Sequence, residues 1–128
     1  MYLDTDCILA LVKDSDWLKK PVQRRLKSEK KLSTSVLSIV ECRLVLLRES
    51  IPEEAFSVEE EIKKWKIKLI PLDEKILNKG KKLMQEFDFL GTFDALHIAT
   101  AIIQSEKIMS SDHVFSLIPE LEVVDPRG

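Results

Sequence analysis

The sequence predicts an α/β protein: a three-layer α/β/α sandwich in which helices cover both faces of a parallel sheet of about five strands. Short apolar runs alternate with longer segments of helical periodicity along the whole chain. The connections between these runs are too long for hairpins and contain no Asn-Gly turn, so they imply helical crossovers between parallel strands. No repeat or Gly- or Ser-rich linker interrupts residues 1–128, so we expect a single domain.

Five short runs have the length and apolar character of strands. The expected strands are residues 1–5, 32–34, 67–70, 107–110 and 121–124. Pro71 closes the third run, because proline cannot donate a hydrogen bond to a sheet.

Six segments between these runs have helical periodicity. The expected helices are residues 8–13, 17–29, 36–49, 52–66, 74–87 and 93–105. Pro52 suits the first turn of its helix, where no backbone N–H is needed. Four other residues precede or begin helices and are favourable N-caps. These are Asp16, Ser35, Asp73 and Thr92.

The composition excludes several classes of protein. Hydrophobic residues are 45% and charged residues 33%, with a net charge of -2, so the chain is neither disordered nor basic enough to coat nucleic acid. Two cysteines, Cys7 and Cys42, are too few for a disulfide framework or a four-ligand zinc site. We find no signal peptide and no apolar stretch of about 18 residues, and therefore expect a cytoplasmic protein without membrane association. One Asn and three Gln resemble a thermophile composition.

Four carboxylates are expected to meet at one edge of the predicted sheet. Asp4 lies near the end of the first strand, and Asp112 lies just beyond the fourth. Asp94 lies in the first turn of its helix, and Glu41 lies about 8 Å from the start of its helix, at about 1.5 Å per residue. In a parallel sheet, crossover helices begin at the edge where strands end, and ligands bind there where the strand order reverses.

Each of these acids also has a purely structural interpretation. Asp4 and Asp112 can be turn residues, and Asp94 suits a helix N-terminus on electrostatic grounds alone. Glu41 can pair with Arg43, but its helix is apolar nearly all round, so we expect it to be buried. The convergence of all four favours a functional site.

A cluster of four carboxylates needs a compensating cation. Mg²⁺ and Mn²⁺ prefer carboxylate and water ligands, and the scarcity of Cys and His argues against zinc. Such ions polarise phosphate groups and generate hydroxide for phosphodiester hydrolysis. The sequence therefore predicts a Mg²⁺ or Mn²⁺ site at this edge.

Four motifs resemble those of PIN-domain ribonucleases. They are Tyr2-Leu3-Asp4-Thr5-Asp6, Ser38-Ile39-Val40-Glu41, Phe93-Asp94-Ala95-Leu96-His97-Ile98-Ala99-Thr100-Ala101 and Ser110-Ser111-Asp112-His113-Val114-Phe115. The third is the most specific, being similar to the family's D-A-x-x-x-A-x-A helix. The four occur in the family's order and cover nearly the whole chain.

This resemblance implies a sheet in the order 3-2-1-4-5 and a metal-dependent endoribonuclease. The implied catalytic and metal-binding residues are Asp4, Glu41, Asp94 and Asp112. The implied supporting residues are Thr5, Asp6 and Ser110, of which the last orients the loop of the fourth acid. A chain of this size resembles the toxin of VapBC-type toxin–antitoxin pairs, which implies an RNA substrate, a homodimer and a protein antitoxin.

Several residues near these motifs keep two interpretations. Asp6 is a fifth acid of the site or a cap of the following helix. His97 lies one turn after Asp94, and it is interpreted either as a proton shuttle or as a histidine that is simply packed in the fold. The same two interpretations apply to His113. Residues 13–31 hold eight basic and three acidic side chains. This stretch is interpreted either as a surface that steers RNA towards the acidic site or as a solvated helix face.

A dimer interface is expected on the helix at residues 52–66 and the residue before it, which the sheet is not expected to cover fully. The apolar residues concerned are Ile51, Phe56, Val58 and Trp65.

Two other functions compete with the ribonuclease. Haloacid-dehalogenase-like phosphatases also open with an Asp-x-Asp strand, which Asp4 and Asp6 match, but Ile8 stands where that family expects Thr or Val. A non-catalytic PIN fold acting as an assembly or metal-binding module is the second alternative. The presence of all four acids argues against it.

Overall fold

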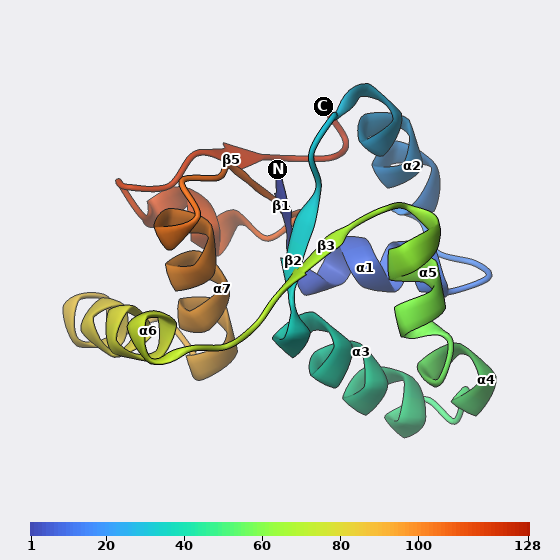
Figure 1. Cartoon of the computed structure of the whole chain (residues 1–128), viewed down its shortest axis with the longest axis horizontal. Helices are drawn as coiled ribbons and strands as arrows, with labels where there is room; N and C mark the ends of the chain where they lie inside the picture. Colours follow the sequence, from blue (N-terminus) through green and yellow to red (C-terminus); the bar gives the residue numbers. More distant parts are fainter.

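The sheet is parallel, with five strands in the order β3-β2-β1-β4-β5, so the predicted fold class and strand order are confirmed (Figure 1). The computed structural model describes all 128 residues. The strands are β1 (Tyr2–Leu3), β2 (Ser33–Ser35), β3 (Lys68–Ile70), β4 (Ile108–Met109) and β5 (Val123–Val124). The strand order reverses between the neighbouring strands β1 and β4, where Leu3 pairs with Met109.

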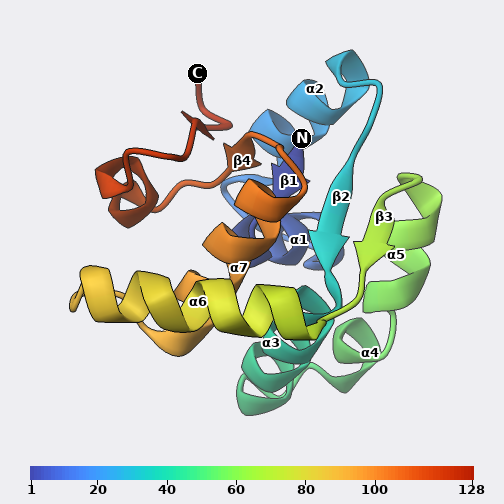
Figure 2. The same ribbon diagram turned by 60° about the vertical axis from the view of Figure 1, so that its left-hand side comes forward.

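Helices cover both faces of this sheet (Figures 1 and 2). One face carries α1 (Thr5–Val12), α2 (Lys19–Ser28), α3 (Val36–Arg48), α4 (Pro52–Ala55) and α5 (Val58–Lys64). The other carries α6 (Glu74–Glu86), α7 (Thr92–Ile103) and a 3₁₀ helix, η1 (His113–Leu117). None of these helices combines the length and the apolar character needed to span a bilayer.

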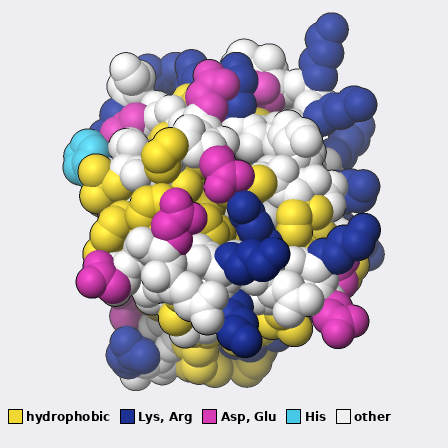
Figure 3. All heavy atoms as spheres, turned by 90° about the vertical axis from the view of Figure 1, so that its left-hand side faces the viewer, with side chains coloured by type: hydrophobic (Ala, Val, Ile, Leu, Met, Phe, Trp, Pro, Cys, Tyr) yellow, Lys and Arg dark blue, Asp and Glu magenta, His cyan; other side chains and the backbone are white.

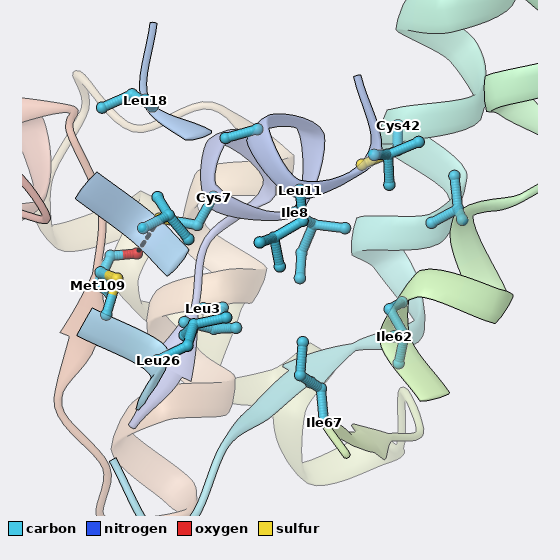
Figure 4. Packing of buried hydrophobic residues seen from close by; sticks show 14 of the residues in the cluster. Leu3, Cys7, Ile8, Leu11, Leu18, Leu26, Cys42, Ile62, Ile67 and Met109 are labelled. Atoms are coloured by element: carbon cyan, nitrogen blue, oxygen red, sulfur yellow. Dashed lines mark hydrogen bonds between the residues drawn. The ribbon is translucent and has the colours of Figure 1, made fainter. Parts of the chain in front are cut away.

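Alternating side chains of the central strands divide the core into two layers. Leu3 and Met109 face the α1 side, whereas Tyr2 and Ile108 face the α7 side, as the period of two in a strand requires. Figure 4 shows the first layer, in which the Cys7 thiol donates a 3.4 Å hydrogen bond to the Met109 carbonyl. These contacts fix α1 against β4, so the chain that follows β1 is held beside the chain that follows β4.

The first turns of three helices lie at the carboxyl edge of the sheet. α1 begins two residues after β1, and α3 begins directly after β2. The Ser35 hydroxyl accepts from the Leu37 backbone N–H at 3.1 Å and caps α3, as predicted. α7 begins at Thr92, near the same edge (Figure 2).

Several predicted helix boundaries are wrong. α1 begins at Thr5 instead of residue 8, because β1 ends at Leu3 and Asp4 already occupies the N-cap position. The expected helix at residues 52–66 is broken into α4 and α5, and the turn between them lets both short helices bury apolar side chains. The N-cap of α7 is Gly91, so Thr92 is the first helical residue.

The helix at residues 36–49 is not buried all round. Val40, Leu44 and Leu47 form a stripe on α3 with exposed fractions of 47%, 51% and 44%. Their spacing of three and four residues places them on one face of the helix. The expectation of a fully buried helix is wrong because the apolar stripe of α3 is wider than the surface it packs against.

The expected apolar patch around α4 and α5 is also wrong. Val58 is fully buried, and Ile51 and Trp65 pack against the core beneath these helices. Phe56 alone of the four is largely exposed, at 64%. The other three side chains all face the core, Ile51 from before α4 and the other two from after the break, so this segment offers no continuous apolar surface.

The basic stretch at residues 13–31 lies away from the carboxyl edge. In Figures 1 and 2, α2 lies toward the amino ends of the strands, on the opposite side from the first turns of α3 and α7. Val22 and Leu26 are buried, while Lys20 and Arg24 are exposed. This position favours the interpretation of a solvated helix face over one that steers RNA.

Candidate active site

Asp4 lies directly after β1, at the point where the strand order reverses. Its backbone N–H donates to the Met109 carbonyl at 3.0 Å, and its side chain is only 7% exposed. The Ser110 hydroxyl donates to Asp4 Oδ2 at 2.8 Å. Burial and the neighbouring Asp6 carboxylate raise the pKa of Asp4 to about 7, despite the opposing effects of His97 and Ser110.

Glu41 reaches the same edge from α3 and is half-buried. The Thr5 hydroxyl donates to Glu41 Oε1 at 2.7 Å, and the Nε2 atom of His97 contacts the same oxygen. The alternative ion pair with Arg43 does not form, because that guanidinium pairs with Glu59 and donates to the Ala55 carbonyl.

Asp94 lies in the first turn of α7 and is half-buried. Burial and the charge of Asp112 raise the pKa of Asp94, with a further contribution from Glu41 and an opposing one from His97. Its side chain does not cap the helix. Asp94 therefore lies within the electrostatic reach of two of the other predicted ligands.

Asp112 is exposed and caps η1, which the sequence did not predict. Its carboxylate accepts from the Val114 N–H at 3.0 Å. The Asp112 backbone N–H donates to the Ser110 hydroxyl oxygen at 3.0 Å. Ser110 is thus shared between Asp4 and the Asp112 loop.

Asp6 does not cap the helix that follows it, so that interpretation is wrong, but its carboxylate lies close enough to Asp4 to raise the pKa of that residue. Its Oδ2 accepts from the backbone N–H of Ser111 at 2.8 Å and from the Ser111 hydroxyl. Its Oδ1 is buried without a hydrogen-bond partner. Asp6 therefore ties the first turn of α1 to the loop after β4 instead of capping its own helix.

His97 is fully buried between α7 and the sheet. It contacts Glu41, Thr5 and Tyr2. Burial alone would lower the pKa of His97, but the hydrogen bond with Glu41 and the surrounding carboxylates raise it. His113 is exposed. The position of His97 one turn after an acid in an apolar helix was the only sequence signal for this contact.

The carboxylates are coupled electrostatically but do not form a closed cluster. No group of three or more Asp, Glu, His or Cys side chains is arranged to hold a metal ion. No Lys or Arg forms an ion pair with any of the four predicted ligands. The edge thus holds an excess of negative charge, and its donor atoms are the carboxylate oxygens that Mg²⁺ and Mn²⁺ prefer. The donor types fit such an ion, although the side chains are not gathered around one point.

The sequence also matches a family model over most of its length. The PIN domain model covers residues 1–121. The chain belongs to the PIN domain family. This membership argues against the haloacid-dehalogenase-like alternative, whose second Asp would be Asp6, here occupied with Ser111. Comparison with curated proteins gives no match.

Solved structures share this PIN domain fold. VapBC2 from Rickettsia felis, bound to a promoter DNA fragment, has a TM-score of 0.76 at 16% identity, covering 96% of this chain and 96% of that one. Mycobacterium tuberculosis VapC20, a sarcin-ricin loop cleaving toxin, has a TM-score of 0.76 at 14% identity, covering 94% of this chain and 97% of that one. FitAcB from Neisseria gonorrhoeae has a TM-score of 0.73 at 18% identity, covering 98% and 96%. At these identities the likeness shows the fold alone.

Proposed function

We propose that this PIN domain is a Mg²⁺- or Mn²⁺-dependent endoribonuclease that hydrolyses RNA phosphodiester bonds. Its proposed catalytic and metal-binding residues are Asp4, Glu41, Asp94 and Asp112. The observation that carries the proposal is the burial of Asp4 at the carboxyl edge without a Lys or Arg partner. A buried carboxylate of this kind is unfavourable until a cation compensates its charge.

A bound divalent cation polarises the scissile phosphate and lowers the pKa of water, which is the chemistry that this hydrolysis requires. The supporting residues keep the acids in place. Ser110 donates to Asp4 and accepts from the Asp112 backbone. Thr5 donates to the carboxylate on α3, and Asp6 holds the loop after β4 through the adjacent serine. These contacts prepare the geometry of the site before substrate binds.

We also propose that the chain is the toxin of a toxin–antitoxin pair. This proposal is supported by the structures of similar fold, which include VapBC2 bound to promoter DNA, FitAcB and a sarcin-ricin loop cleaving toxin. An antitoxin would bind as a second protein and hold the nuclease inactive. The buried free thiols Cys7 and Cys42 and an RNA substrate are both compatible with a cytoplasmic protein. A gene for a small DNA-binding protein directly upstream would support this role.

A homodimer remains part of the proposal, but on a different surface from the one the sequence favoured. Leu77 and Met84 of α6 are exposed by 48% and 37%, and Phe93 of α7 by 38%. Leu77, Met84 and Leu96 line a groove of about 350 Å³ between these helices. Figure 3 views the molecule from the α6 side and shows apolar side chains gathered among acidic and basic ones. Such patches commonly mark interfaces between subunits.

The direct test is cleavage of single-stranded and structured RNA by the purified chain. We expect endonucleolytic cleavage that requires Mg²⁺ or Mn²⁺ and stops with EDTA. A phosphomonoester substrate run in parallel should not be hydrolysed. Failure to cleave any RNA despite Mn²⁺ binding would support the non-catalytic module, and hydrolysis of the phosphomonoester alone would reinstate a phosphatase.

A further inference from the structure

A buried hydrogen-bonded chain connects the central strand to the predicted site. Tyr2 of β1 and His97 of α7 are both fully buried. The Tyr2 hydroxyl lies 2.5 Å from His97 Nδ1, and His97 Nε2 contacts Glu41 Oε1. The chain therefore runs from the interior of the sheet through an imidazole to a carboxylate of the site, joining elements that are remote in sequence.

The direction of these hydrogen bonds follows from the chemistry of the partners. An ionised Glu41 carboxylate can only accept, so the Nε2 atom of His97 must carry a hydrogen. Burial raises the pKa of the Tyr2 hydroxyl well above its ordinary value, so this group remains neutral and can either donate to Nδ1 or accept from it. Nε2 therefore faces Glu41 as a donor whichever state Nδ1 is in.

One oxygen of Glu41 receives both available donors. Thr5 donates to Oε1 at 2.7 Å, and His97 contacts the same atom. The second oxygen, Oε2, has no protein hydrogen-bond partner. Two donors on one oxygen restrict rotation of the carboxylate and leave Oε2 as the oxygen able to bind a cation.

We propose that His97, itself fixed by Tyr2, is a positioning residue that holds Glu41 Oε1 so that Oε2 alone is presented to the divalent cation. This inference rests on the proposed function of the carboxyl edge. His97 reaches the site through another residue and need not touch RNA. The buried Tyr2 hydroxyl has the same role one step further away, because it fixes the orientation of the imidazole ring.

Two substitutions of His97 separate positioning from packing. In His97→Gln, the side-chain amide nitrogen can occupy the place of Nε2 and donate to Glu41. In His97→Asn, the shorter amide can reach the Tyr2 hydroxyl but not Glu41. Both variants replace a buried ring with a smaller polar amide. A role in packing alone therefore predicts a similar loss of Mn²⁺ affinity in both.

The first measurement is Mn²⁺ affinity, obtained from the electron paramagnetic resonance signal of free Mn²⁺. We expect His97→Asn to weaken Mn²⁺ binding by roughly 10- to 100-fold, as loss of a residue that orients a metal ligand does. The Mn²⁺ affinity of His97→Gln should stay within a few-fold of that of wild type. The affinity of Tyr2→Phe should fall between those of the two His97 variants. Equal affinity in the wild type and His97→Asn, or equal weakening in both His97 variants, would overturn the inference.

The second measurement needs neither metal nor activity. The chain has two histidines, so a ¹⁵N spectrum of the metal-free imidazoles is simple to assign using His97→Gln. We expect a protonated Nε2 in His97, and an unprotonated Nε2 would overturn the inference. A wild type that binds Mn²⁺ and cleaves RNA, together with an unaffected His97→Asn, would refute this inference and leave the proposed function standing. A wild type that neither binds Mn²⁺ nor cleaves RNA would refute both.

Discussion

Replacing Asp4 with Asn should stabilise the metal-free protein, and the gain should grow with pH. Burial and the charge of Asp6 raise the pKa of Asp4 from its ordinary value of 3.8 to about 7, so the folded state binds this proton more tightly than the unfolded state does. The stabilisation provided by the bound proton is complete below the unfolded pKa and is lost as pH rises through the folded pKa. Asn keeps an oxygen that can accept the Ser110 hydrogen bond but does not ionise.

The two pKa values set the size of the effect. Between pH 5 and pH 8, wild type should lose on the order of 3 kcal/mol of stability through Asp4, at ~1.36 kcal/mol per pH unit. For a chain of this length, that loss corresponds to roughly 10 °C in Tm. The variant Asp4→Asn should not show this loss.

The assay is thermal unfolding followed by circular dichroism in EDTA at pH 5, 6.5 and 8. Asp88→Asn is the matched control, because Asp88 is exposed and lies outside the predicted site. At pH 8, added Mn²⁺ should stabilise the wild type more than Asp4→Asn, since ligand binding to the native state raises its stability. If Asp4→Asn is less stable than wild type by the same margin at pH 5 and pH 8, the argument from burial and repulsion is wrong.

Three further predictions concern stability and association. Ser110→Ala should cost about 1 kcal/mol of metal-free stability at pH 8 in urea unfolding, because Asp4 loses its donor; an unchanged midpoint would contradict this role. Met84→Glu should convert the expected dimer to a monomer in light scattering at micromolar concentration, while Leu44→Glu on α3 should not. The scarcity of amides predicts a Tm above the mesophile range of about 45–65 °C, and a midpoint inside that range would remove the thermophile inference.

The alternation of short apolar runs and helical segments was enough to predict the layered α/β fold. Strand order was not available from this pattern, because spacing does not say which strands pair, and it came from the resemblance to the PIN family. The short helices α4 and α5 were predicted as one helix, because Phe56 and Ser57 are not residues that strongly break a helix. The exposed face of α3 was missed because Val40 and Leu44 are as apolar as the residues that pack.

The four acids could be placed at one edge because parallel strands end there. Their supporting contacts could not be predicted, because they join distant parts of the chain. Asp6 and Ser111 are 105 residues apart in sequence, and their contact depends on the pairing of β1 with β4. The Tyr2–His97 contact depends equally on how α7 lies across the sheet.

Asp94→Asn tests the central claim most directly, because this change keeps the size of the side chain and removes the charge of one proposed ligand. Cleavage of single-stranded RNA should be measured in Mn²⁺ for the wild type, Asp94→Asn and Asp88→Asn, with metal-free melting of the same samples. The four-carboxylate site predicts cleavage by the wild type and Asp88→Asn, none above background for Asp94→Asn, and no loss of metal-free stability in that variant. Cleavage by Asp94→Asn at the wild-type rate with added Mn²⁺ would contradict the proposed mechanism.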